Sequence, residues 1–175
     1  MQNWRVMNAT IRILGLDPGL QRTGWGIIRC EGARTSYIAH GVIAPPTNAA
    51  LADRLGYLAR ELDLVLADHS PTETAIEETF MANNARSALL LGHARGALMA
   101  KLSLAGLPVA EYAARFVKKA LVGAGAAEKD QVAFMVRRML PTAGNVNADA
   151  ADALAVALTH AACRGAPQLK QGGAG

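Results

Sequence analysis

The chain has 175 residues, of which 51% are hydrophobic and 18% are charged, and its formal net charge is +4. This length and composition predict one domain with a sizeable core and exclude a disordered chain. The sequence has neither an apolar run near the roughly 20 residues of a membrane span nor a signal-peptide-like N-terminus, so we expect a cytoplasmic protein that binds no membrane.

The modest positive charge is compatible with a polyanionic partner, although many basic proteins bind no nucleic acid. The two cysteines, Cys30 and Cys163, lie far apart and lack the spacing of metal ligands. We therefore predict that both are free thiols, Cys30 at the end of a strand and Cys163 at the end of a helix.

The first half of the chain is predicted to form three strands, a helix and a fourth strand. Short apolar runs joined by turns indicate an antiparallel meander over residues 11–17, 25–30 and 37–44. Apolar residues at helical spacing follow from Asn48, which we expect to cap the helix, to about Ala67. Residues 73–77, with the sequence ETAIE, are then a short strand that ends in acidic residues.

The second half alternates helices and one more strand. Residues 84–105 are rich in Ala and Leu, and Gly106 and Pro108 end the long helix that they predict. Residues 108–113 predict a fifth strand. Shorter helices are expected at about 115–122, 131–140 and 149–163.

This order predicts an α/β domain over residues 11–163, with a mixed five-stranded sheet and helices on both faces. Residues 1–10 are expected to be an N-terminal extension, and the Gly-rich residues 164–175 to be a disordered tail.

Four carboxylates are predicted to converge at one edge of this sheet. Asp17 ends the first strand and Glu77 the fourth, and these strands can lie side by side. Asp149 and Asp152 are three residues apart near the start of the last helix, so they share a face. Crowded carboxylates repel one another unless a cation neutralises them, and oxygen ligands suit Mg²⁺. The pattern therefore indicates metal-assisted phosphoryl displacement, in which two ions clamp the attacking and leaving oxygens.

Most of these acids also have an ordinary structural explanation. Asp17 precedes Pro-Gly, which is typical of a turn. Asp149 can cap a helix or face its dipole, and Glu77 can simply be solvated. Asp152 is harder to explain in this way, because it lies among apolar residues and must face either solvent or a polar site.

The chain resembles the RuvC family of Holliday-junction resolvases in four segments that occur in the same order and at similar spacing: LGLDPGLQRTGWGII, AIEETFMANNARSALLLGHARGAL, EYAARFVKKALVGAGAAEKDQV and NADAADALAVALTH. The resemblance implies an RNase H-like fold and symmetrical nicking of two strands of a four-way DNA junction, which leaves 5′-phosphate and 3′-hydroxyl ends. It also implies a homodimer and, as a partner, the RuvAB branch-migration complex.

Transferred by position, the resemblance assigns four catalytic residues that are also metal ligands: Asp17, Glu77, Asp149 and Asp152. It implies Mg²⁺ as the cofactor, with two ions in each site, and Mn²⁺ is expected to replace Mg²⁺ because both accept oxygen ligands. The long helix at 84–105 is apolar on more than one side, and the matching helix of the family forms the dimer interface.

The DNA-binding residues that we expect are Phe80, Arg115, Lys118 and Lys129. Phe80 matches a phenylalanine that contacts the junction, where it would stack on an unpaired base, although a place in the core is its ordinary explanation. Lys118 and Lys129 match basic positions that touch DNA in the family. Arg115 lies in the same basic cluster, and such residues contact phosphates without distinguishing sequence.

Two other classes of protein remain as alternatives. A sugar- or acetate-kinase-like protein opens with a similar strand, Asp and Gly-rich turn, but it needs a second domain and an adenosine site for which 175 residues leave no room. A non-catalytic DNA-binding module could share the fold, but it would have no reason to retain four crowded carboxylates. Because the fold hosts several nucleases, junction specificity rests on the resemblance.

Overall fold

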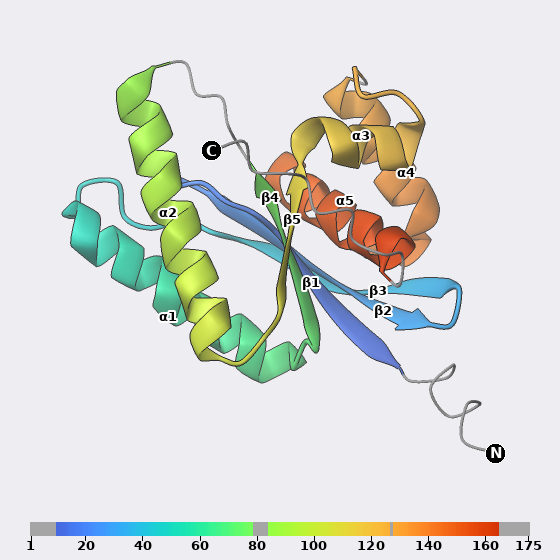
Figure 1. Ribbon diagram of the computed structural model, residues 1–175, viewed down its shortest axis with the longest axis horizontal. Coiled ribbons are helices and arrows are strands. Elements are labelled where there is room, and N and C mark those ends of the chain that lie inside the picture. The colour runs from blue at the N-terminus through green and yellow to red at the C-terminus, as the bar shows by residue number, and fades with distance from the viewer. Residues whose placement is uncertain (1–9, 79–83, 127, 165–175) are drawn as a thin grey trace, which may run out of the picture.

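The computed structural model describes residues 10–78, 84–126 and 128–164. Within them, five strands form one mixed sheet in the order β3-β2-β1-β4-β5 (Figure 1). The strands are β1 (Ile11–Asp17), β2 (Thr23–Glu31), β3 (Arg34–Ile43), β4 (Glu73–Glu78) and β5 (Val109–Ala113). The first three are antiparallel, whereas β4 runs parallel to both β1 and β5. The predicted α/β class and mixed five-stranded sheet are confirmed.

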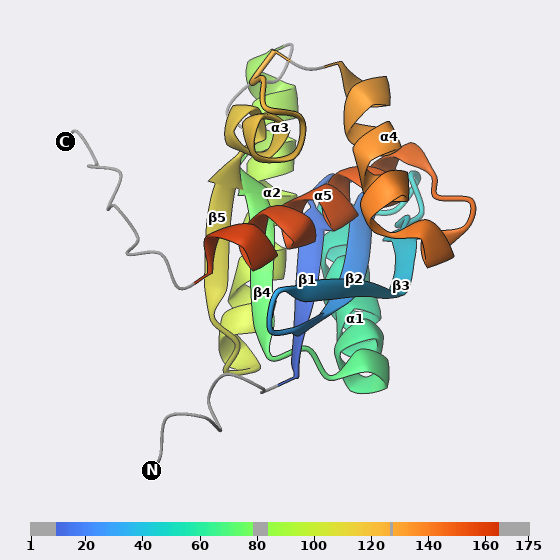
Figure 2. The same ribbon diagram turned by 90° about the vertical axis from the view of Figure 1, so that its right-hand side faces the viewer.

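Helices cover both faces of the sheet, as the order of elements predicts (Figure 2). One face packs against α1 (Leu51–His69) and α2 (Ala85–Leu104). The other face packs against α3 (Ala114–Val122), α4 (Lys129–Met139) and α5 (Ala148–Cys163). The central strand β1 is buried without interruption from residue 13 to residue 16, as expected for a strand with helices on both sides.

Glycines in β1 and β2 let α5 lie directly on the sheet. A Cβ atom on Gly24 would lie 2.0 Å from the backbone oxygen of Asp149, and one on Gly15 would lie 2.1 Å from that of Ala153. No larger residue fits at these two positions without moving the helix. The first two turns of α5, which carry the last pair of acidic residues, are therefore held against the ends of β1 and β2.

The predicted helix boundaries agree with the structure to within one residue, except that α1 begins three residues later and ends two residues later than predicted and α4 begins two residues earlier. That helix begins at Leu51, and its N-cap is Ala50, which makes no side-chain capping bond. The prediction that Asn48 is the cap is wrong, because the chain turns into the helix two residues later. Asn84 does cap α2, since its side chain accepts a hydrogen bond from the backbone nitrogen of Ser87 at 2.9 Å.

Cys30, at the end of β2, and Cys163, the last residue of α5, are both free, as predicted. Among the helices of the described ranges, none is long and apolar enough to cross a membrane. The structure describes only residue 10 of the expected N-terminal extension and only Arg164 of the expected tail.

Candidate active site

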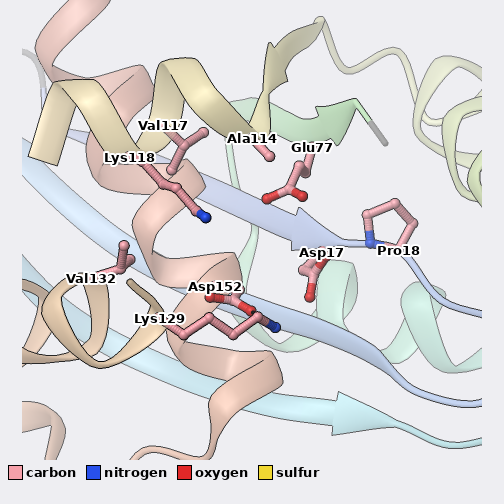
Figure 3. Close-up of a pocket in the computed structure, with 9 residues that line it drawn as sticks. All are labelled: Asp17, Pro18, Glu77, Ala114, Val117, Lys118, Lys129, Val132 and Asp152. Carbon is pink, nitrogen blue, oxygen red and sulfur yellow. The ribbon is translucent and has the colours of Figure 1, made fainter. Parts of the chain in front are cut away.

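The carboxyl ends of β1 and β4 bring two acidic residues together. The two strands are parallel and Leu16 pairs with Ile76, so Asp17 and Glu77 follow at neighbouring positions on the same edge of the sheet. Asp152, in the second turn of α5, joins them from the face that α5 covers. These three carboxylates line one cavity of about 280 Å³. Figure 3 shows how they lie relative to one another.

The remaining walls of this cavity combine two cations with apolar side chains. Lys118 of α3 and Lys129 of α4 extend into it (Figure 3). Lys129 Nζ lies 3.4 Å from Asp152 Oδ2, and this carboxylate raises the pKa of Lys129. The apolar lining residues are Pro18, Ala114, Val117 and Val132.

Burial and mutual repulsion make these carboxylates hard to ionise together. Burial, followed by the negative charges of Glu77 and Asp152, raises the pKa of Asp17 to about 8. Burial and the charge of Asp152 raise the pKa of Glu77 to about 7. Burial also raises the pKa of Asp152, although Lys129 opposes that shift. If all three were ionised, their charges would exceed those of the two lysines, so burial and mutual repulsion favour protonated Asp17 and Glu77 near pH 7 when no cation is bound.

Asp149 occupies a different place from the other three acids. Its Oδ2 accepts a hydrogen bond from Nε of Arg22 at 2.6 Å, and it lines a neighbouring cavity instead of the one that holds Asp17. Of the four carboxylates predicted to converge at one edge of the sheet, three thus line one cavity, and Asp149 lines the cavity beside it. Asp149 is turned aside because the Arg22 guanidinium attracts its carboxylate, yet its charge is close enough to raise the pKa of Asp17.

The predicted DNA-binding residues fall into three groups. Lys118 and Lys129 line the acidic cavity, whereas Arg115 is exposed on α3 outside it. Phe80 lies outside the residues that the structure describes. No role at the site was predicted for Arg22 or Arg95 from the sequence. Both reach the acidic residues from distant parts of the chain, so local patterns contain no signal for them.

The donor chemistry of the cavity fits a divalent cation. Within residues 10–78, 84–126 and 128–164, no three His, Cys, Asp or Glu side chains already stand as a ready-made metal site. However, three half-buried carboxylates with raised pKa values form a set of hard oxygen donors whose repulsion a cation would relieve.

Comparison with known proteins identifies close relatives. The family model of crossover junction endodeoxyribonuclease RuvC matches residues 13–160. The crossover junction endodeoxyribonuclease RuvC of Caulobacter vibrioides is 56% identical over 91% of this chain and 96% of its own length. That of Maricaulis maris is 58% identical over 93% of this chain and 98% of its own length.

Solved structures agree with these relatives. Thermus thermophilus RuvC in complex with Holliday junction substrate superposes with a TM-score of 0.80 at 33% identity, covering 86% of this chain and 93% of that one. The Thermus thermophilus RuvC structure gives a TM-score of 0.78, covering 87% of this chain and 95% of that one, also at 33% identity. The RNase H-like fold that the resemblance implied is confirmed.

Proposed function

Because this chain belongs to the RuvC family of crossover junction endodeoxyribonucleases, we propose that the cavity between Asp17, Glu77 and Asp152 is the site at which it cleaves DNA. The protein is a Holliday-junction resolvase of DNA recombination and repair. It nicks two strands of the junction symmetrically, depends on a divalent metal, and leaves 5′-phosphate and 3′-hydroxyl ends. The observation that carries the proposed location is the convergence of three half-buried carboxylates, at the ends of β1 and β4 and in the second turn of α5.

The metal of this site is Mg²⁺ in our proposal, with two ions in each site and with Mn²⁺ able to replace it. Its ligands would be Asp17, Glu77 and Asp152, with Asp149 completing the set. When bound, such ions activate water and stabilise the oxygen that leaves the phosphorus atom. The raised pKa values of Asp17 and Glu77 support this assignment, because carboxylates that repel one another bind a cation strongly.

The other residues of the cavity bind and orient the DNA strand. Lys118 and Lys129 place two ammonium groups where non-bridging phosphate oxygens would lie, and such contacts position DNA without distinguishing its sequence. Val117 and Val132 give the cavity apolar walls that exclude bulk water, which strengthens each charge interaction inside. Phe80 and Arg115 are proposed to contact the junction outside this cavity.

The proposed assembly is a homodimer that presents two such sites to the two equivalent strands of a junction. The exposed apolar side chains of α2 support this proposal, since Leu89 and Leu104 are 61% and 86% exposed in the single chain. A helix that leaves large apolar side chains in solvent on one side, while it packs Leu98 into the core on the other, is typical of an interface. The RuvAB complex remains the proposed partner, and residues 11–163 the proposed nuclease domain.

A cleavage assay tests the proposed function and site together. A labelled four-way junction is incubated with Mg²⁺ and either wild type, Asp17→Asn or Asp68→Asn, with a linear duplex and an RNA–DNA hybrid as control substrates. Asp68 is exposed on α1 and serves as the matched control. We expect paired nicks on the junction alone, lost in Asp17→Asn and retained in Asp68→Asn, with junction binding unchanged.

Two results would contradict the proposal. If wild type binds the junction but does not cut it, the cavity is not a nuclease site and the chain acts as a binding module. If wild type cuts the hybrid instead of the junction, the metal site stands and the substrate assignment fails.

A further inference from the structure

A second cavity, of about 380 Å³, lies beside the acidic one. The loop between β1 and β2 separates the two, since Pro18 lines the first cavity and Gly19 the second. The other walls of the second cavity come from the starts of α1, α2 and α5. A DNA strand that enters the acidic cavity therefore passes close to this second one.

The second cavity has the opposite charge balance. Its charged lining residues are two arginines, Arg22 and Arg54, and one acid, Asp149. Ser87, in the first turn of α2, also lines this cavity. Its backbone nitrogen donates a hydrogen bond to Asn84 Oδ1, and its hydroxyl group is a further donor. Two guanidinium groups and a hydroxyl group are the donors that proteins use to bind phosphate.

Arg22 lies on the loop between β1 and β2, which hydrogen bonds hold in place, and Arg54 of α1 contacts the same loop. Thr23 is completely buried, and its Oγ1 donates to the carbonyl oxygen of Gly19 at 2.8 Å. Arg54 Nη2 donates to the carbonyl oxygen of Leu20 at 2.9 Å. The Nε of Arg54 is buried and has no hydrogen-bond partner among the residues that the structure describes.

Arg22 differs from Arg54 in its freedom to take a new partner. Its side chain is 54% exposed, and within the described part of the chain its ion-pair partner is Asp149 alone. A carboxylate and a phosphate diester compete for the same face of a guanidinium, because both offer two oxygens to its paired donors.

We propose that this second cavity binds a phosphate of the junction DNA next to the one that is cleaved, with Arg22 exchanging Asp149 for that phosphate. The inference rests on the proposed function, since it requires the DNA strand to enter the neighbouring acidic cavity. Arg54 and Ser87 supply the fixed part of the phosphate site, and Arg22 supplies the part that moves. Asp149, once released, becomes available to the proposed metal site, so DNA binding and completion of that site are coupled.

The test is the salt dependence of junction binding in the presence of a chelator, measured by fluorescence anisotropy at several KCl concentrations. Neutralising one phosphate contributes about 0.9 to the slope of log affinity against log salt. We expect Arg22→Gln to lower the slope by about this amount and to weaken binding several-fold at low salt. Arg22→Lys should retain the slope, because the charge remains. Ser87→Ala should weaken binding at an unchanged slope, because a hydroxyl group displaces no counterion.

The matched control is Arg29→Gln, at the far end of β2. Arg29 pairs in register with Arg12 at the start of β1, away from both cavities, and its own ion-pair partner is Glu31 at 3.9 Å. Its replacement should leave the slope unchanged.

Repeating the measurement in an Asp149→Asn variant distinguishes two roles of Arg22: direct binding of the phosphate, and neutralisation of Asp149. In Asp149→Asn, the acid that Arg22 pairs with is removed. If Arg22→Gln still lowers the slope in this background, Arg22 contacts the phosphate directly. If it then has no effect, Arg22 serves only as the partner of Asp149 and the inference is overturned.

The outcomes for the inference and for the proposed function are distinguishable. If wild type binds the junction no better than linear duplex, the proposed function fails. The slope difference of Arg22→Gln, measured on whichever DNA binds, still decides whether the phosphate site exists.

Discussion

Arg95 of α2 donates from its Nε to the backbone carbonyl oxygen of Glu77 at 3.2 Å. The same guanidinium forms an ion pair with the carboxylate of Glu111 on β5. Arg95 thus connects α2 to the end of β4 and to the middle of β5, and it holds the backbone that carries an acid of the proposed site. Because α2 is also the proposed dimer helix, this contact links the interface to the site.

We expect Arg95→Gln to slow junction cleavage by about 10- to 100-fold with little change in junction affinity, because displacement of a reacting group by about 1 Å is enough for such a loss. Single-turnover cleavage and anisotropy measure the two quantities separately. Glu111→Gln is a milder variant for comparison. It removes the ion pair but leaves the hydrogen bond between Arg95 and the Glu77 carbonyl oxygen. Equal losses of affinity and rate in Arg95→Gln would show that Arg95 does not act through Glu77.

Asp17→Asn should stabilise the metal-free protein at pH 7. The pKa of Asp17 is raised to about 8, whereas in the unfolded chain the group is ionised above about pH 4, so folding at pH 7 requires this carboxylate to take up a proton, which costs stability. Removing the charge should increase the free energy of unfolding by about 1–3 kcal/mol in urea titrations with a chelator present. In the wild type, added Mg²⁺ should recover this stability by binding the folded state. A lower free energy of unfolding for Asp17→Asn would show that burial and repulsion of the acidic residues do not destabilise the metal-free protein.

Glu73 anchors the end of α5 that lies far from the proposed site. Its carboxylate accepts hydrogen bonds from Arg164 at 2.7 and 3.0 Å, and its Oε2 lies 3.0 Å from His160 Nε2. The Arg164 guanidinium lowers the pKa of Glu73, while burial lowers the pKa of His160. Both shifts mean that the unfolded chain binds more protons than the folded one in acid.

The stability that these two groups contribute is therefore present above about pH 6.5 and is lost as the pH falls through the range of His and then of Glu. We expect Glu73→Gln to lower the free energy of unfolding at pH 7 by about 1–2 kcal/mol and to flatten its decline below about pH 5, where Glu73 itself takes up a proton. Urea titrations across this range provide the measurement. Cleavage by the folded variant at pH 7 should be unchanged, and an equally steep acid decline would refute this account of Glu73.

Gly24→Ala should damage both stability and cleavage. The new Cβ would lie 2.0 Å from the backbone oxygen of Asp149, so the start of α5 must move away from the sheet. Overpacking of this kind costs about 1–3 kcal/mol, and the shift also displaces Asp152. The control is Gly56→Ala in α1, where a Cβ meets only the tip of the Arg60 side chain at 3.3 Å. Thermal unfolding and single-turnover cleavage should separate the two variants, and equal stability would contradict the packing argument.

Leu89→Glu should dissociate the proposed dimer. Leu89 is 61% exposed on α2, and a charge placed in an apolar interface cannot be solvated there. Leu64→Glu is the matched control, because Leu64 is 57% exposed on α1, outside the proposed interface. Light scattering should give a monomer for Leu89→Glu and a dimer for Leu64→Glu. A dimer for both variants would move the interface away from Leu89.

The order and nature of the elements could be predicted from the sequence because they depend on local patterns. Alternating and helical spacing of apolar residues placed the strands and helices nearly where they occur. The approach of Asp17 to Glu77 followed too, since both residues end short apolar runs and parallel neighbouring strands bring such ends together. The start of α1 was not predicted correctly, since Ala50 and not Asn48 is its N-cap.

The pairing of side chains around the acidic residues was decided only by the tertiary structure. Arg22 meets Asp149 across 127 residues of sequence, and Arg95 meets the Glu77 carbonyl across 18. A loop arginine has no periodicity to reveal its partner, and the direction in which Asp149 turns depends on which cation the fold brings nearest. The sequence by itself thus determined which acids lie at one edge of the sheet. The packing of α5 on glycines of β1 and β2, and the cations placed around it, decided that three of them share a cavity while the fourth faces the next one.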